Sequence, residues 1–508
     1  MRLPTISRDD RAVIIALVFF TLLFRLATIM MINTGVDERD YWQSARAMVR
    51  GFPYPELSHR TTRFGVILPV AAAQAILGSH PNIYYVMPIL NCMVQAALAY
   101  MIGLRLRGRL TGLLFSLSLT LFPYMIRAGS QVRPEIFSIT YMLLAFMYFI
   151  TYMDKRNDSV RPLLWMALWL FVSYLTNVTN LFLVPGLLAA VLFYKRRGDH
   201  ALTLAGMLFG LFIAETALYA LFTRYRFGEL EIIMQKHFHA DSFTVPHIID
   251  LLRRYAPENL QLYWSLPFAI FGIASIFYLV RGRDRRVQGL MLAALSFFFL
   301  ITVAVKGLHP ITPAESFINR YFSVVLVPVF LALSYIVEGL THRIPGSGRA
   351  MALLGSARAY LALMAIGLVG MLCIFSVPAL PARFRQYAHS PLVPQRHPFF
   401  LNEHYRQLID SAYSEGIPIV ATQGLAGYSA LVTASSFYLG LDVFRDGKAP
   451  EPVPISSNGV PCLVLSRTGT LNGATRVLLA RRLPFSVEYA SLGDLSALTD
   501  QATMKEDE

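Results

Sequence analysis

Apolar runs of about 20 residues recur along this chain from Ala12 to about Leu380, and each is long enough to cross a hydrocarbon core of about 30 Å as a helix. Hydrophobic residues make up 55% of the chain and charged residues only 15%, unlike an ordinary soluble protein. Only helices or closed barrels satisfy their backbone in lipid, and these runs lack the strict alternation of barrel strands. The sequence therefore predicts a polytopic α-helical membrane protein.

Basic residues gather in short links between the apolar runs. The net charge of +14 could suggest a nucleic-acid partner, but the basic clusters recur at every second link. Such links face the cytoplasm under the positive-inside rule. The charge is therefore expected to set the membrane topology, and no nucleic-acid partner is predicted. The clusters are Arg105, Arg107 and Arg109; Lys155, Arg156 and Arg161; Lys195, Arg196 and Arg197; and Arg281, Arg283, Arg285 and Arg286.

The basic links orient the predicted spans. The first span, Ala12–Ile32, leads from a cytoplasmic N-terminus into a long external loop at about residues 34–82. Within this loop, Phe64–Leu77 is too short to cross and is predicted to be an interfacial helix, because a crossing there would put the later basic links outside. About 11 spans result; the later ones are Ile83–Leu104, Leu110–Met125, Ile136–Met153, Leu163–Tyr174, Leu181–Tyr194, Leu202–Phe222, Leu260–Val280, Val287–Val305, Tyr321–Leu340 and Ala359–Leu380.

The last part of the chain changes character. Residues 1–381 are expected to form the membrane domain, whereas charge rises and apolar runs stop in residues 382–508. Short strands are predicted at residues 416–421, 437–441 and 461–466, with a helical pattern at Glu403–Ser414. This segment is expected to be a small extracytoplasmic α/β domain.

Two adjacent carboxylates, Asp37 and Glu38, follow the first span. A charge near hydrocarbon is unfavourable, by about 2.5–3.5 kcal/mol at a helix centre and less towards the interface. On position alone, the pair marks either the start of a solvated loop or a functional site. Other polar residues gather at the same predicted external face: His59, Arg60 and Arg63; Arg127, Arg133 and Glu135; His237, His239 and Asp241; and Lys306, His309, Glu315, Arg320 and Tyr321.

Arginines at this face suit an anionic phosphate at the membrane surface. A guanidinium stays charged and forks onto phosphate oxygens, each such bond contributing roughly 1.5–3 kcal/mol. A single arginine there could instead snorkel to lipid headgroups, but Arg63, Arg133 and Arg320 together, beside an acid pair, favour a binding site. Arg25, near the outer end of the first span, either snorkels or faces the cavity.

A metal site is not indicated. His237 and His239 with Asp241 could ligate a metal, but the spacing lacks a third fixed ligand, so a basic loop that touches headgroups or substrate is favoured. No cofactor is predicted.

Five motifs follow one another along the chain: Gly35–Arg46 with its Asp-Glu pair, Gly51-Phe-Pro-Tyr54, Ala75-Ile-Leu-Gly78, the turn Arg127 to Arg133-Pro-Glu135, and Asn319-Arg-Tyr321. In this order they resemble the GT-C glycosyltransferases, and most closely the protein O-mannosyltransferases and the lipid A aminoarabinose and galacturonic acid transferases. The resemblance covers roughly residues 12–340. There are two departures: relatives usually carry Pro-Pro after a Lys or His before the interfacial helix, where this chain has Arg63-Phe-Gly-Val-Ile-Leu-Pro69, and many carry Asp where this chain has Glu135.

The resemblance implies sugar transfer from a polyprenyl-phosphate-linked donor to an acceptor at the external face of a bacterial inner membrane. The acceptor would be lipid A or its core, an envelope glycan or a protein. Asp37 suits the general base of a single inverting displacement, and Glu38 would orient it, bind the acceptor or raise its basicity. Arg133 and Arg320 would steady the phosphate. Secondary candidates are Arg63 and Tyr321 for the phosphate, and His59, Arg60, Glu135, His237 and His239 for the substrate cavity.

Two other functional classes stay open. A secondary transporter or flippase of an envelope precursor would show inverted repeats, Gly- or Pro-broken helices and polar residues near the midplane. Here no internal repeat is evident and the polar residues gather at one face. An O-antigen ligase or polymerase would carry its chemistry in a late loop and not after the first span.

Overall fold

The computed structural model describes residues 7–28, 36–50, 61–78, 81–154, 159–223, 262–282, 284–303, 305–308, 311–313, 319–341, 419–421, 461–466, 474–482 and 487–494. The predicted span Ala359–Leu380, the predicted helix Glu403–Ser414 and the predicted strand at residues 437–441 lie outside this part of the chain.

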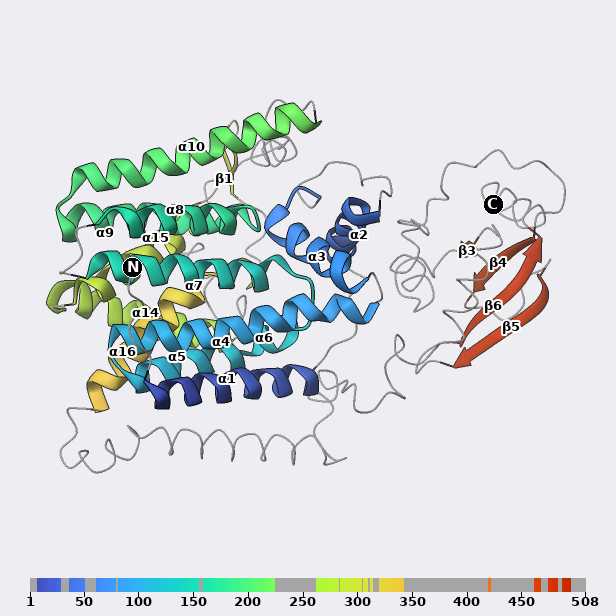
Figure 1. The fold of residues 1–508 in the computed structure, drawn as a ribbon, viewed down its shortest axis with the longest axis horizontal. Helices are drawn as coiled ribbons and strands as arrows, with labels where there is room; N and C mark the ends of the chain where they lie inside the picture. Colours follow the sequence, from blue (N-terminus) through green and yellow to red (C-terminus); the bar gives the residue numbers. More distant parts are fainter. Residues whose placement is uncertain are drawn as a thin grey trace. The chain divides into compact units, whose positions relative to one another are not determined.

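Helices account for most of the described residues (Figure 1). They are α1 (Arg8–Ala27), α2 (Val36–Arg50), α3 (Phe64–Leu77), α4 (Val86–Leu106), α5 (Arg109–Leu121), α6 (Pro123–Ala128), α7 (Pro134–Met153), α8 (Arg161–Tyr174), α9 (Val184–Ala190), α10 (Gly198–Thr223), α14 (Leu262–Arg281), α15 (Arg285–Val303) and α16 (Leu326–Thr341), with the short turns η1 (Pro81–Tyr85), η2 (Val178–Leu183), η3 (Val191–Lys195) and η4 (Asn319–Phe322).

The chain divides into two compact units, and the boundary falls within α3. The first unit consists of Met1–Ile29, Glu56–Val70 and Tyr85–Ala388, and the second of Met30–Pro55, Ala71–Tyr84 and His389–Glu508. The acid pair thus belongs to a different unit from the later helices.

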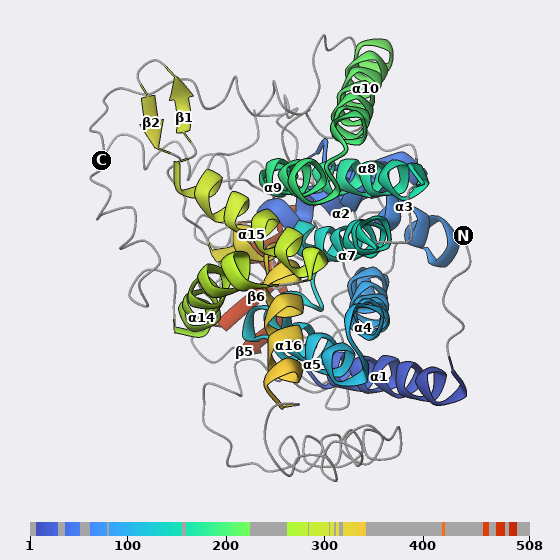
Figure 2. The same cartoon turned by 90° about the vertical axis from the view of Figure 1, so that its left-hand side faces the viewer.

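The first unit is a helix bundle. Helix α4 packs against α1, α5 and α7, while α8 packs against α7 and α10 (Figure 2). Within the described residues, five helical stretches are long and apolar enough to cross a membrane: Ile83–Leu106, Pro134–Met153, Val178–Lys195, Gly198–Ala217 and Tyr263–Arg281. Each predicted span in the described part of the chain overlaps a helix, with differences at Leu110–Met125, Val287–Val305 and Tyr321–Leu340. The prediction of an integral membrane protein built from helices is confirmed.

One predicted span is broken into two helices. The run Leu110–Met125 reads as continuous, but α5 ends at Leu121 and α6 begins at Pro123. Phe122 adopts an extended backbone conformation (φ −61°, ψ 129°), which the residue before a proline prefers. Pro123 then occupies the start of α6, where its missing N–H is not needed.

The end of the predicted span Val287–Val305 and the start of Tyr321–Leu340 also differ from the prediction. Helix α15 ends at Val303, and Val305–Leu308 (β1) pairs antiparallel with Ile311–Pro313 (β2). Helix α16 begins only at Leu326, because the preceding Asn319–Phe322 forms the tight turn η4.

The basic links lie together at one end of the bundle. Arg286, at the start of α15, donates from Nη2 to the carbonyl of Leu106 at 3.0 Å. Lys195 donates from Nζ to the carbonyl of Asp154 at 2.8 Å, which joins the end of η3 to the end of α7. Arg107 lies over the ring of Tyr335 with 4.4 Å between its Cζ and the ring centroid. We call this the Asp10 end, because α1 begins there.

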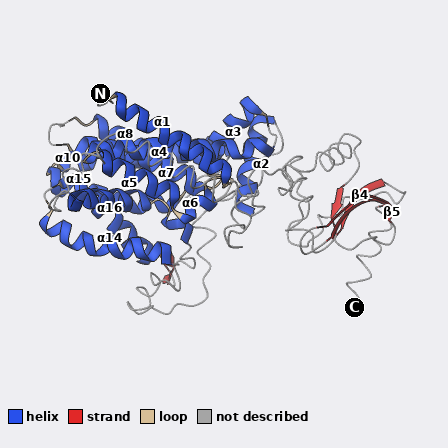
Figure 3. Ribbon diagram, turned by 90° about the horizontal axis from the view of Figure 1, so that it is seen from below, coloured by secondary structure: helices blue, strands red, loops and turns tan. Residues whose placement is uncertain are grey.

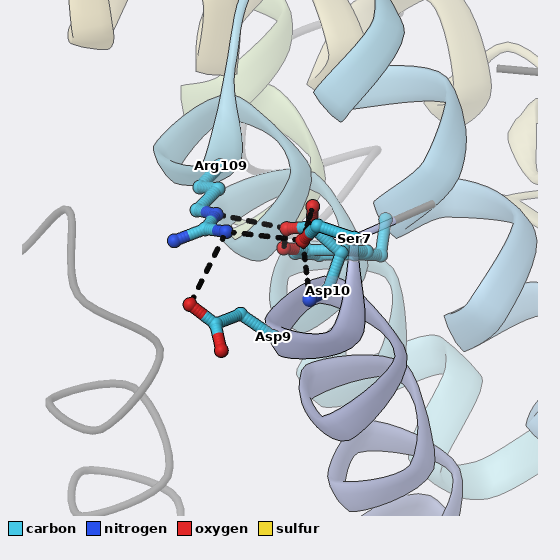
Figure 4. A network of polar contacts seen from close by, with 5 residues as sticks. Ser7, Asp9, Asp10 and Arg109 are labelled. Atoms are coloured by element: carbon cyan, nitrogen blue, oxygen red, sulfur yellow. Dashed lines mark hydrogen bonds and ion pairs between the residues drawn. The ribbon is translucent and has the colours of Figure 1, made fainter. Parts of the chain in front are cut away.

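Asp10 is the centre of a polar network at that end (Figure 4). Its carboxylate accepts hydrogen bonds from Arg109 Nε at 2.8 Å, from Tyr100 Oη at 3.0 Å and from the Ser7 hydroxyl. Ser7 is also the N-cap of α1, and its hydroxyl accepts from the Asp10 backbone N–H at 3.1 Å. These hydrogen bonds join the start of α1 to α4 and α5, about a hundred residues later in the sequence.

Strands β3 (Ile419–Ala421), β4 (Pro461–Ser466), β5 (Ala474–Arg482) and β6 (Val487–Asp494) form a sheet in the order β3-β4-β6-β5 (Figure 1). β4 and β5 are labelled among the red strands of Figure 3. β3 and β4 pair in parallel, whereas β6 pairs antiparallel with both β4 and β5. The strands predicted at residues 416–421 and 461–466 coincide with β3 and β4, while β5 and β6 were not predicted.

Candidate active site

Asp37 and Glu38 lie in the first turn of α2. The backbone N–H groups of a first helical turn have no partner within the helix, and the helix dipole is positive there, so negative charge is stabilised. Glu38 is buried at 4% exposure, and Asp37 is half-buried. Since α1 ends at Ala27, the acid pair opens a helix of its own and does not sit on the end of the first span.

The rest of α2 is packed within the second unit. Tyr41 and Trp42 are fully buried, and the Trp42 and Tyr84 rings lie 5.6 Å apart. Gln74, on the second half of α3, donates from Nε2 to the carbonyl of Trp42 at 3.2 Å. These contacts hold α2 in place one turn after the acid pair, so the backbone that carries the two carboxylates is well packed.

Arg133, Glu135 and Arg320 come together in the first unit. Arg133 is the N-cap of α7, Pro134 begins the helix and Glu135 lies in its first turn. Glu135 is buried at 2% exposure, and its Oε1 lies 3.9 Å from Arg320 Nε. Arg320 belongs to η4, and its guanidinium lies over the neighbouring Tyr321 ring at 5.4 Å. The turn η4 and the start of α7, almost two hundred residues apart in the sequence, thus meet at a charged site.

Tyr124, in α6, is a further member of this site. Its buried side chain lies close enough to Arg133, Glu135 and Arg320 to interact electrostatically with all three. The Tyr124 and Trp264 rings are 5.5 Å apart, so the tyrosine also packs against α14. We call Tyr124, Arg133, Glu135 and Arg320 the Arg133–Arg320 cluster.

The cluster leaves one acceptor unused. Glu135 Oε2 is buried and accepts no hydrogen bond from the described residues, and its other oxygen makes only the long contact with Arg320. An unsatisfied buried carboxylate oxygen is unfavourable by about 1–3 kcal/mol or more. It is therefore a place where a ligand hydroxyl can donate.

Arg63 is buried at 8% exposure immediately before α3. Its carbonyl accepts the first helical bonds, from the N–H groups of Val66 and Ile67. The start of α3 is held within the first unit, because Gly65 N–H donates to Leu175 O at 3.2 Å and Tyr141 Oη donates to Gly65 O at 3.0 Å. Arg63 therefore sits at an anchored helix start.

The remaining candidates are not described by the structure. His59, Arg60, His237 and His239 lie outside the described residues, and so does the Arg127 side chain. Among the residues that are described, no group of three His, Cys, Asp or Glu side chains could hold a metal ion. Of the predicted site residues, the structure brings together Asp37 with Glu38 in one unit, and Arg133, Glu135, Arg320 and Tyr321 in the other.

The chain is similar over nearly its whole length to solved structures of ArnT from Cupriavidus metallidurans. The structure of ArnT bound to undecaprenyl phosphate matches with a TM-score of 0.55 at 13% identity, covering 95% of this chain and 98% of ArnT. ArnT in the apo state matches with a TM-score of 0.54 at 14% identity, covering 96% of this chain and 98% of ArnT. This chain has the fold of ArnT.

The fold similarity confirms the resemblance drawn from the acid pair, the Arg133 turn and Asn319-Arg-Tyr321 at the level of fold. At such low identity the likeness concerns the fold alone. No protein-family model matches the chain, and no curated protein matches it in sequence.

Proposed function

We propose that this chain is a membrane glycosyltransferase that moves a sugar from a polyprenyl-phosphate-linked donor to an acceptor hydroxyl of the cell envelope. The observation that carries the proposal is the match to ArnT over 95% of this chain, since that ArnT structure holds undecaprenyl phosphate. The Arg133–Arg320 cluster supports it from this chain's own residues. The acceptor would be lipid A or its core, another envelope glycan or a protein.

Asp37 is the general base in the proposed reaction. The acceptor oxygen attacks the anomeric carbon, the bond from that carbon to the phosphate oxygen breaks, and Asp37 takes the acceptor proton. A single displacement of this kind inverts the anomeric centre and needs one base, because phosphate departs without an acid. The half-buried position of Asp37 on a helix start suits this role, with Glu38 as its buried neighbour.

Arg133 and Arg320 bind the donor phosphate in this proposal. Negative charge grows on the phosphate oxygens as the sugar departs, and a guanidinium placed there stabilises the transition state more than the ground state. Arg63 and Tyr321 are secondary candidates for the same phosphate, and His59, Arg60, His237 and His239 are candidates for the wall of the substrate cavity.

Glu135 is expected to recognise the donor sugar and not the phosphate. A carboxylate would repel phosphate, but its unused Oε2 can accept from a sugar hydroxyl. The contact with Arg320 would then hold the guanidinium and the sugar-binding oxygen in fixed relation.

The membrane orientation follows from the charge distribution. The basic links meet at the Asp10 end of the bundle, which the positive-inside rule assigns to the cytoplasm. The Arg133–Arg320 cluster then faces the periplasmic side of a bacterial inner membrane, with residues 382–508 as an extracytoplasmic domain.

The test is Asp37→Asn in the full-length chain. A deletion strain is complemented with the wild-type chain or with the variant, and envelope glycolipids and glycoproteins are compared by mass spectrometry. We expect the glycolipids and glycoproteins of the strain that carries the variant to lack the added sugar mass. The purified variant should still bind undecaprenyl phosphate in native mass spectrometry.

Asp40→Asn is the matched control, because it makes the same chemical change on the same helix. It should keep both product and lipid binding. Full product formation by Asp37→Asn would show that Asp37 is not the base. A wild-type chain that neither binds undecaprenyl phosphate nor changes any glycan would refute the glycosyltransferase proposal itself.

A further inference from the structure

Arg25 is a buried guanidinium held by backbone carbonyls. It lies near the end of α1 at 1% exposure, and its Nη1 and Nη2 donate to Met125 O at 2.7 Å and to Thr120 O at 2.8 Å. No carboxylate of the described residues forms an ion pair with it, and its Nε has no hydrogen-bond partner there. The sequence left open whether this arginine snorkels or faces a cavity; at 1% exposure and bonded to two backbone carbonyls, it does not snorkel.

Of the two carbonyls, Thr120 O is the one that the break at Phe122 leaves in need of a donor, whereas Met125 O also accepts from the Gly129 N–H at 2.8 Å. Thr120 lies in the last turn of α5 and Met125 in the last turn of α6. The final carbonyls of a helix have no intrahelical partner, and the helix dipole is negative at that end. Because α5 stops at Leu121, Arg25 supplies the donor that a continuing helix would have supplied.

Gly129 makes room for the guanidinium. A Cβ at this position would lie 2.7 Å from Arg25 Cζ, 2.8 Å from its Nε and 2.6 Å from Met125 O. Backbone and guanidinium would both have to shift, since real Cβ contacts are longer. Gly129 and Arg25 therefore fit as a pair, and the turn that follows Gly129 leads directly to Arg133.

We propose that Arg25 is a positioning residue for the donor-phosphate site, which rests on the function proposed above. By capping α5 and α6 together, it sets the angle at the Phe122 break and so the place of α6. Helix α6 carries Tyr124, and the chain after it carries Arg133 and Glu135. Arg25 thereby acts on the Arg133–Arg320 cluster through backbone and does not touch the substrate.

The choice of arginine for this task has an electrostatic reason. A neutral donor could cap one carbonyl, but the planar guanidinium reaches two carbonyls from different helices with fixed geometry. A buried charge with no counter-ion is unfavourable. The charge also adds to the positive potential at this end of the bundle, which favours an anionic ligand.

The experiment compares Arg25→Gln, Arg25→Lys and Gly129→Ala with the wild-type full-length chain. Undecaprenyl phosphate is the probe, and its Kd is measured by native mass spectrometry in detergent. We expect Arg25→Gln and Gly129→Ala to weaken binding about tenfold, as loss of one or two charge-assisted bonds would. Arg25→Lys should recover part of the affinity, because an ammonium can cap one carbonyl.

Trp264 gives a signal that does not depend on the proposed activity. Its fully buried ring lies 4.7 Å from the Phe122 ring and 5.5 Å from the Tyr124 ring, so it reports on the break and on α6. Its emission is isolated by subtracting the spectrum of the same variant carrying Trp264→Phe. Arg25→Gln and Gly129→Ala should change this emission in the same direction.

Arg109→Gln is the control, because it breaks the Asp10 network at the opposite end of α1. It should lower the thermal unfolding midpoint while leaving both the Kd and the Trp264 emission unchanged. The inference is overturned if Arg25→Gln and Gly129→Ala behave like this control. If wild type binds no undecaprenyl phosphate but Arg25→Gln still changes the Trp264 emission, the function proposed above fails and the positioning role of Arg25 stands.

Discussion

The two ends of α1 use charged side chains in opposite ways. At the Asp10 end, one buried carboxylate accepts hydrogen bonds from Arg109, Tyr100 and Ser7. At the other end, the Arg25 guanidinium donates to two backbone carbonyls. Glu135 Oε1 lies 3.9 Å from Arg320 Nε, and Glu135 Oε2 has no hydrogen-bond partner among the described residues.

This difference separates a polar network that stabilises the fold from a charged cluster that suits a ligand. At the Asp10 end, an acid, a base and two hydroxyls satisfy one another, which fastens α1 to α4 and α5. At the α6 end, Glu135 Oε2 is buried without a hydrogen-bond partner among the described residues, an arrangement that is unfavourable unless a ligand completes it. The first network therefore serves stability, and the Arg133–Arg320 cluster suits an anionic substrate.

The largest expected effect is on donor binding at the Arg133–Arg320 cluster. Arg320→Gln should lower kcat/KM about 100-fold, because a guanidinium bonds to phosphate through two charge-assisted hydrogen bonds. It should also lower the thermal unfolding midpoint, since buried Glu135 would lose its nearby charge. The measurements are turnover with a polyprenyl-phosphate sugar and thermal unfolding in detergent.

A double mutant sharpens this prediction. Adding Glu135→Gln to Arg320→Gln should restore the unfolding midpoint, because the uncompensated buried carboxylate is gone. It should not restore kcat/KM, because the phosphate contact stays lost. Recovery of both the unfolding midpoint and kcat/KM would mean that Arg320 and Glu135 serve stability, like the Asp10 network. The proposed difference between the two ends of α1 would then be wrong.

Arg109→Gln tests the other side of the comparison. Loss of the charged bond to Asp10 should reduce the free energy of unfolding by about 2 kcal/mol, the value typical of a hydrogen bond to a charged group. Turnover per folded molecule should stay within about twofold of wild type. Thermal unfolding in detergent and turnover on the same sample check this, and a large loss of turnover at unchanged stability would contradict it.

Tyr124→Phe is expected to have a smaller effect at the cluster. It removes one hydroxyl from beside Arg133, Glu135 and Arg320 while keeping the ring that packs on Trp264. We expect KM for the donor to rise about fivefold, the size of one ordinary hydrogen bond, with kcat little changed. An unchanged KM for the donor would mean that the Tyr124 hydroxyl does not contribute to donor binding and that the arginines alone hold the phosphate.

The helices could be predicted from the sequence because lipid imposes a simple length rule. The segment Phe64–Leu77, predicted to be interfacial, coincides with the helix α3, and the predicted span Ile136–Met153 lies within α7. The break in Leu110–Met125 was missed, although Pro123 was a visible signal. Hydropathy continues across it, and the partner that stabilises the break, Arg25, lies about a hundred residues earlier.

The site could be predicted only where its residues are charged. Arg133, Glu135 and Arg320 stand out because charge is rare beside an apolar run. Tyr124 did not stand out, since tyrosines are common at membrane interfaces and its neighbours come from distant parts of the chain. The acid pair was recognised, but its place at the start of α2 depends on where α1 stops.

The smallest expected effect is a pH dependence at the Asp10 end. Burial raises the pKa of Asp10, but hydrogen bonds from Ser7, Arg109 and Tyr100 outweigh it and hold the pKa below its ordinary value of about 3.9. A carboxyl whose pKa is lower in the folded state stabilises the fold above the unfolded pKa and loses that contribution as pH falls through the folded pKa. Wild type should therefore exceed Asp10→Asn in unfolding midpoint at pH 7, and the gap should narrow below about pH 4. A gap that stays constant over this range would mean that the Asp10 charge does not hold the network, and the contrast between the two ends of α1 would then rest on packing alone.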